Sequence, residues 1–183
     1  QIGVEITHKK EKTYTFCAKN IRCEYFETED YYKKSSSLRG SIMLLGPLLA
    51  RLGYAVAPKP GGDKIGRRRL DTHFEGMRKL GANFTYDEIK QQYRIESKKL
   101  KGCYMLLDEA SVTGTANILM TAVLADGVTT IYNAACEPYI QQLCKMLNSM
   151  GAKIEGIGSN LLTITGVNSL KGCEHTILPD MIE

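Results

Sequence analysis

The most constraining feature of this sequence is an internal duplication with a period of 70 residues. The motif Leu80-Gly81-Ala82-Asn83-Phe84 returns as Met150-Gly151-Ala152-Lys153-Ile154, and Leu100-Lys101-Gly102-Cys103 returns as Leu170-Lys171-Gly172-Cys173. This period is too long for an ordinary solenoid and fits one supersecondary unit copied in tandem. We therefore expect the chain to fold as copies of a single unit.

The later copy predicts the order strand, helix, strand, helix, strand, strand. Ser111 begins an apolar helix that extends to about residue 125, and Pro138 lies in the first turn of a second helix that ends at Gly151. Short runs typical of strands surround these helices, at 103–108, 128–132, 153–157 and 161–165. The predicted fold class is α/β (α+β), built from tandem βαβαββ units.

The earlier copy follows the same order, with a longer loop between its second strand and second helix. Its expected elements are a strand at 23–26, a helix at 37–52, a strand at 54–57, a helix at 70–80, and strands at 83–86 and 93–96. Residues 2–7 and 13–18 predict a closing hairpin, and 174–183 an opening strand. The units are thus 1–20 (partial), 21–98, 99–168 and 169–183 (partial), which indicates one domain of a longer chain.

Composition narrows the class of protein. The chain is 43% hydrophobic, and its longest apolar run, 42–49, is far shorter than the roughly 20 residues of a membrane-spanning helix. The first residues of the given sequence do not have the pattern of a signal peptide. Six widely separated cysteines without a Cys-x-x-Cys pair favour reduced thiols in the cytosol over disulfides or a zinc site. The net charge of +4 is mild, and no aromatic-basic pattern indicates a nucleic-acid partner.

The stretch 59–71 carries the strongest functional signal. Its three glycines bracket the carboxylate of Asp63, and five cations fall within eleven positions. Glycine lets backbone N–H groups face an anion, and arginine matches carboxylate and phosphate oxygens in two-point contacts. The pattern predicts a site that binds a small anion and moves one proton. The alternative is a solvated loop in which Asp63 is a turn residue.

The same stretch resembles a known family. The sequence PGGDKIGRRRLDTH is similar to the active-site loop of the UDP-N-acetylglucosamine enolpyruvyl transferases of the EPSP synthase superfamily, which typically reads Pro-Gly-Gly-Cys-x-Ile-Gly-x-Arg-x-x-Asp-x-His. Matches also occur at Leu38-Arg39-Gly40-Ser41, Ser111-Val112-Thr113-Gly114-Thr115, Ala134-Ala135-Cys136-Glu137-Pro138 and Leu178-Pro179-Asp180.

This resemblance implies one domain of an inside-out α/β barrel whose two domains each contain three copies of the unit. The implied reaction transfers the enolpyruvyl group of phosphoenolpyruvate to the 3′-hydroxyl of UDP-N-acetylglucosamine, by addition and elimination, in cytoplasmic peptidoglycan synthesis. The implied partners are these two substrates and a second domain of the same full-length chain, with no nucleic acid and no membrane. No cofactor and no metal are implied.

The resemblance also implies roles for individual residues. Asp63 takes the place of the proton-donating cysteine, which implies insensitivity to fosfomycin, an epoxide that alkylates that cysteine. The implied substrate-binding residues are Arg39, Arg68, Arg69, Leu70, Asp71, Thr72, Ser111, Val112 and Thr113. Arg69 occupies a position that is usually proline, and Glu109 one where some relatives have lysine.

Other residues are interpreted as structural, and other functions stay open. His73 is expected to be a partly buried helix residue, and His8, His175 and the cysteines are assigned no chemistry. The alternative functions are a shikimate-pathway enolpyruvyl transferase and a non-catalytic repeat domain that binds anions or RNA.

Overall fold

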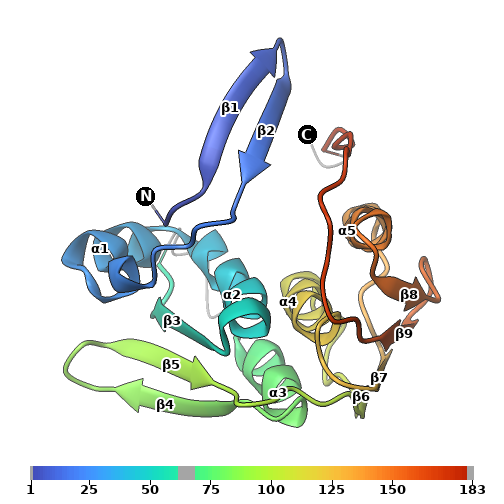
Figure 1. The fold of residues 1–183 in the computed structure, drawn as a ribbon. Helices are drawn as coiled ribbons and strands as arrows, with labels where there is room; N and C mark the ends of the chain where they lie inside the picture. Colours follow the sequence, from blue (N-terminus) through green and yellow to red (C-terminus); the bar gives the residue numbers. More distant parts are fainter. Residues whose placement is uncertain (1, 62–68, 181–183) are drawn as a thin grey trace.

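The protein places a group of helices between two β-sheets, with a hairpin projecting from one side (Figure 1). A computed structural model describes residues 2–61 and 69–180. The projecting hairpin consists of the antiparallel strands β1 (Glu5–Lys10) and β2 (Thr13–Cys17), in which every residue is exposed. The expected hairpin is confirmed, although its first strand lies three residues later than the expected 2–7.

The first sheet has three antiparallel strands in the order β3-β5-β4. Strand β3 (Tyr54–Pro58) pairs with β5 (Gln92–Glu96), which also pairs with β4 (Asn83–Asp87). Ile95 of β5 lies opposite both Ala55 and Phe84, and its side chain is fully buried. The three expected strands of the earlier copy are therefore confirmed.

The second sheet has four strands in the order β6-β7-β9-β8. Strand β6 (Tyr104–Leu106) is parallel to β7 (Val128–Tyr132), and β9 (Leu161–Thr165) is antiparallel to β7 and to β8 (Lys153–Glu155). Helix α4 (Val112–Ala122) follows β6, and α5 (Pro138–Ser149) follows β7. The predicted order of six elements is confirmed across this copy.

The earlier copy departs from its prediction at its first element. Residues 23–26 are not a strand but part of a 3₁₀ helix, η1 (Cys23–Glu27), followed by an unpredicted helix, α1 (Glu29–Ser37). The side chain of Thr28 caps α1 by accepting a hydrogen bond from the Tyr31 N–H group. The buried Tyr31 hydroxyl donates to the Val56 carbonyl oxygen at 2.7 Å. This backbone acceptor of β3 is therefore paired with a side chain and not with another strand.

The helix expected at 37–52 is also wrong, because it is interrupted. Leu38 is extended and ends α1, after which come a 3₁₀ helix, η2 (Arg39–Leu44), and α2 (Leu45–Leu52). Pro47 is the third residue of α2, where the helix needs no N–H donor. A continuous helix would place this proline in the interior, where it breaks the hydrogen-bond ladder.

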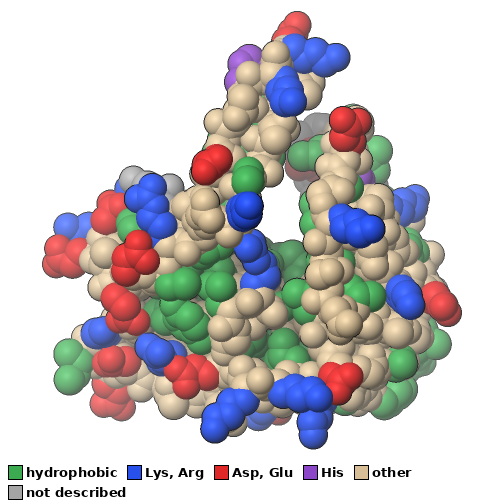
Figure 2. All heavy atoms as spheres, in the orientation of Figure 1, with side chains coloured by type: hydrophobic (Ala, Val, Ile, Leu, Met, Phe, Trp, Pro, Cys, Tyr) green, Lys and Arg blue, Asp and Glu red, His purple; other side chains and the backbone are tan. Residues whose placement is uncertain are grey.

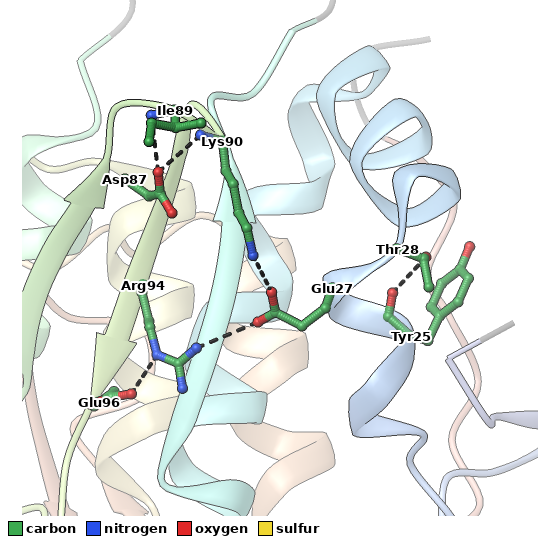
Figure 3. A network of polar contacts seen from close by, with 8 residues as sticks. All are labelled: Tyr25, Glu27, Thr28, Asp87, Ile89, Lys90, Arg94 and Glu96. Atoms are coloured by element: carbon green, nitrogen blue, oxygen red, sulfur yellow. Dashed lines mark hydrogen bonds and ion pairs between the residues drawn. The ribbon is translucent and has the colours of Figure 1, made fainter.

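Ion pairs join η1 to the β4–β5 hairpin (Figure 3). The Glu27 carboxylate accepts from Lys90 Nζ at 2.8 Å and from Arg94 Nη1 at 3.4 Å. Arg94 also pairs with Glu96 and lies 5.6 Å from the ring centroid of Tyr54. Each exposed pair is worth little alone, but the shared carboxylate fixes η1 beside the sheet.

The core lies where α2, α3 (Asp71–Lys79) and α4 pack together between the sheets. Gly76 of α3 allows close packing, since a Cβ atom there would overlap the Ile118 side chain of α4. The largest fully buried side chains are Phe26, Leu45, Leu49, Met77, Leu80, Ile95, Met105, Ile118, Leu119, Ile131, Leu162 and Ile164.

The C-terminal segment is irregular. The strand expected at 174–183 is wrong for 174–180, where the structure has no strand, and 181–183 lie outside the described residues. Ile177 and Leu178 are exposed, and a lone extended segment needs a neighbouring strand to pair with. Across 2–61 and 69–180, no helix is long and apolar enough to cross a membrane.

Candidate functional site

Two helix N-termini meet at the candidate site, those of α3 and α4. Ser111 caps α4, its hydroxyl accepting from the Gly114 N–H group at 3.2 Å. A Cβ atom at Gly114 would lie 2.9 Å from Thr72 Cγ2, so the two helix starts are in close contact. The segments 69–72 and 111–113, which contain most of the implied substrate-binding residues, therefore lie next to each other.

One carboxylate bridges the two helix starts. Asp108, in the connection from β6 to α4, accepts a hydrogen bond from the Thr72 hydroxyl at 2.9 Å. Its other oxygen lies 3.2 Å from Arg69 Nη2, while Arg69 Nε donates to Asp71 at 2.7 Å. These two carboxylates raise the pKa of the Arg69 guanidinium, with Asp71 the larger contribution.

A second bridge runs through His73, whose side chain is only 1% exposed. The Asn117 amide accepts from the Gly46 N–H group, so its nitrogen must be the atom that faces His73 Nδ1 at 3.0 Å. Nδ1 is then an acceptor, and Nε2 carries the proton that it donates to the Thr113 hydroxyl at 3.2 Å. Burial lowers the pKa of His73 to about 4, with a smaller contribution from the positive charge of Arg39. His73 lies on α3, as expected for a helix residue, but it is fully rather than partly buried.

This pKa predicts a loss of stability in acid. The imidazole of the unfolded chain takes up a proton near its ordinary value of 6.5, whereas the folded protein resists until about pH 4. Stability should therefore fall as the pH drops through this window, by about 3 kcal/mol in all. Urea unfolding of the full-length protein and of His73→Gln, at several pH values, measures this contribution. The stability deficit of the variant should shrink on acidification, and a deficit independent of pH would contradict the assignment.

Arg39 lies at the start of η2 and reaches the same region. Its Nη2 atom donates to the backbone carbonyl of Arg69 at 3.4 Å. Arg39 thus lies beside Arg69, another of the residues that the resemblance implies in substrate binding. Asp63 and Arg68, the other two charged residues expected in the site, lie outside the described residues.

A pocket of about 460 Å³ opens beside α3 and the end of β6. Arg69, Asp71 and Thr72 line it, together with Asp108. The other expected residues with described positions, Arg39, Leu70, Ser111, Val112 and Thr113, do not line it. A larger hollow of about 1180 Å³ lies near the base of the hairpin and the segment 166–172, on the side seen in Figure 2, and no expected site residue lines it.

Two residues of the site were missed by sequence reasoning, Asp108 and Asn117. The position of Asp108, three residues before the helix cap Ser111, is the sequence feature that could have identified it. Asn117 lies on an apolar helix, and no sequence feature distinguishes it. Within the described ranges, 2–61 and 69–180, no three His, Cys, Asp or Glu side chains form a group that could hold a metal ion.

Comparison with known proteins decides the family. A family model described as EPSP synthase (3-phosphoshikimate 1-carboxyvinyltransferase) matches residues 1–183. The chain belongs to the EPSP synthase family. Within this family it is similar to proteins named UDP-N-acetylglucosamine 1-carboxyvinyltransferase, with 64% identity over 183 residues to that of Bacteroides thetaiotaomicron and 57% over 149 residues to that of Treponema denticola.

These relatives are longer than the chain. It covers 42% of the Bacteroides protein, while the match to the Treponema protein spans 81% of the chain and 34% of that relative.

Solved structures show the EPSP synthase family fold. The enolpyruvyl transferase NikO from Streptomyces tendae matches 91% of the chain with a TM-score of 0.71 at 20% identity, over 38% of its own length. EPSP synthase from Acinetobacter baumannii matches 93% of the chain with a TM-score of 0.63 at 22% identity, also over 38% of its own length. The expected mixed α/β enolpyruvyl transferase fold is confirmed.

Proposed function

We propose that this chain is part of a UDP-N-acetylglucosamine 1-carboxyvinyltransferase. The reaction transfers the enolpyruvyl group of phosphoenolpyruvate to the sugar 3′-hydroxyl, in the cytoplasmic synthesis of peptidoglycan. The observation that carries the proposal is the 64% identity, over every residue of the chain, to a relative of that name.

The geometry of the two helix N-termini supports binding of a nucleoside diphosphate. First-turn N–H groups lack helical partners, and the helix dipole favours negative charge there. The N-termini of α3 and α4 lie together, with Arg39 and Arg69 beside them. We infer that the segments 69–72 and 111–113 hold the uridine diphosphate group.

Asp63 is proposed as the proton donor to the enol methylene carbon, at the position where the family pattern that the loop resembles usually has cysteine. A general acid must hold its proton near neutral pH, which requires burial, whereas Lys64 and Arg67 favour the carboxylate. We propose that phosphoenolpyruvate neutralises these cations, so that Asp63 becomes a competent acid only when both substrates are bound.

We further infer that the chain supplies the catalytic-loop domain of a two-domain enzyme, with internal units at about 1–20, 21–98, 99–168 and 169–183. The chain spans less than half the length of the relatives that it matches. The remainder of the site would then come from a second domain across a cleft.

The rival function is a shikimate-pathway enolpyruvyl transferase, which the description of the matching family favours. The loop with Gly61 and Asp63 and the cap at Ser111 favour the sugar-nucleotide enzyme, since these motifs resemble the latter. A phosphate-release assay with the full-length protein separates the two. We expect turnover with phosphoenolpyruvate and UDP-N-acetylglucosamine, and none with shikimate 3-phosphate; the reverse would contradict the proposal.

The isolated 183 residues should show no turnover in the same assay. Positioning both reactants supplies a large part of such a rate, up to roughly 7–11 kcal/mol of the barrier, and this chain would supply only part of the site. Phosphate release by the isolated chain that depends on the sugar nucleotide would contradict the two-domain arrangement.

A further inference from the structure

Asp108 joins the two segments that are proposed to hold the sugar nucleotide. We propose that it is a positioning residue. It fixes the start of α3 relative to the start of α4 and so sets the affinity for a nucleoside diphosphate. This inference rests on the proposed function. None of the sequence motifs singled out Asp108.

The contacts of Asp108 reach both segments at once. One carboxylate oxygen accepts from the Thr72 hydroxyl at 2.9 Å, and the other lies 3.2 Å from Arg69 Nη2. Along the chain, Asp108 precedes the cap of α4, Ser111, by three residues. A single side chain therefore ties the segment 69–72 to the segment 111–113.

The backbone that carries Asp108 is held firmly. The Leu107 N–H group donates to the Tyr132 carbonyl oxygen at 3.0 Å, and the Leu107 carbonyl accepts from Asn133 Nδ2 at 3.0 Å. Thr72, on the other side of the tie, is only 3% exposed. The hydrogen bond thus connects the rigid end of the second sheet to a buried side chain of α3.

Arg69 has a matching role as a compensating charge. Two carboxylates beside a diphosphate would repel it, and the Arg69 guanidinium pairs with both Asp71 and Asp108. The family pattern usually has proline at this position, so the pairing is a departure of this chain. Arg69 acts on the nucleotide through the carboxylates that it neutralises and orients.

The exposure of Arg69 and Asp108 allows an effect on ligand binding to be distinguished from an effect on protein stability. Arg69 and Asp108 are about half exposed, at 54% and 47%, so the ion pair contributes little to stability. Displacing the groups that bind the nucleotide nevertheless weakens its binding, because affinity depends on groups that are already held in the binding position. Loss of Asp108 should therefore weaken binding with little change in the unfolding temperature.

The test measures UDP-N-acetylglucosamine binding to the full-length protein by calorimetry. Asp108→Ala should raise the dissociation constant about tenfold, as expected for the loss of a hydrogen bond to a charged group. Asp108→Asn should raise it less, because its amide oxygen can still accept from Thr72. Asp126→Ala is the matched control and should leave binding unchanged. It removes an exposed aspartate that pairs with Lys99 at 2.9 Å and lies beyond the C-terminal end of α4, the end opposite to Ser111.

A double-mutant cycle identifies the partner. Thr72→Val should weaken binding on its own but add little to Asp108→Ala, because both remove the same hydrogen bond, whereas Thr72→Ser should retain binding. In turnover assays, Asp108→Ala should raise KM for the sugar nucleotide about tenfold and leave kcat within about threefold.

Wild-type affinity in Asp108→Ala would overturn this inference, and so would additive effects of Asp108→Ala and Thr72→Val. A fall in kcat with unchanged KM for the sugar nucleotide would also overturn it. Absence of binding by the unsubstituted protein would instead contradict the proposed function, and this inference with it.

Discussion

The full-length protein should keep its activity through prolonged incubation with fosfomycin and UDP-N-acetylglucosamine, whereas its Asp63→Cys variant should be inactivated completely. Opening the epoxide ring requires a soft, strongly nucleophilic thiolate. A carboxylate is a much weaker nucleophile, and a protonated one is weaker still. Asp63→Cys should retain turnover before the inhibitor is added, because both side chains can deliver a proton.

Intact-mass spectrometry after incubation measures the outcome directly. The variant should gain one inhibitor mass, mapped to position 63, and the native protein none. The six native cysteines are the internal control, since none of them lies in the stretch 59–69. An adduct on native Asp63 would refute the prediction. An active but unmodified Asp63→Cys would show that this residue does not occupy the reactive position.

Asn117→Ala should destabilise the protein by about 4 kcal/mol. The Asn117 side chain is fully buried, and it joins three elements. Its oxygen accepts from the Gly46 N–H group at 2.8 Å, and its nitrogen donates to the Ile42 carbonyl at 2.8 Å and to His73 Nδ1 at 3.0 Å. Each partner left buried without a hydrogen bond costs roughly 1–3 kcal/mol.

Asn148→Ala is the matched control for this prediction. Asn148 also accepts from a backbone N–H group and donates to a backbone carbonyl, both of Ile154 and both at 2.9 Å. These groups are only partly buried, so water can replace the lost amide, and the expected loss is about 1 kcal/mol. Urea unfolding of both variants of the full-length protein measures the difference, and equal losses would contradict the proposed role of the buried amide.

The sequence determined the later copy of the unit almost completely. Its elements follow from local patterns, such as the cap at Ser111, the proline at position 138 and the glycine at 151. Each of these residues sets the end of a helix through contacts within one or two turns, so the helix boundaries can be predicted without the tertiary structure. The 70-residue period then placed the strands and the second helix of the earlier copy.

Only the tertiary structure decided how the earlier copy begins. Its first strand is replaced by η1 and α1, because Tyr31 fills the position beside Val56 and the ion pairs of Glu27 fix η1 to the hairpin. These contacts join residues 25 to 67 positions apart. A local sequence pattern cannot specify these contacts. An unpaired backbone group of a strand, or an unpaired charge, raises the free energy of the fold only once distant segments have come together.

The candidate site divides in the same way. The resemblance carried by the stretch 59–71 and by Ser111-Val112-Thr113 predicts which segments bind substrate, and this stays a prediction. It did not indicate that Asp108 joins them, or that Asn117 orients His73, because these contacts span 36 and 44 positions. Residue type and local spacing set the helix starts, whereas packing of α3 against α4 chose the side chains that hold them together.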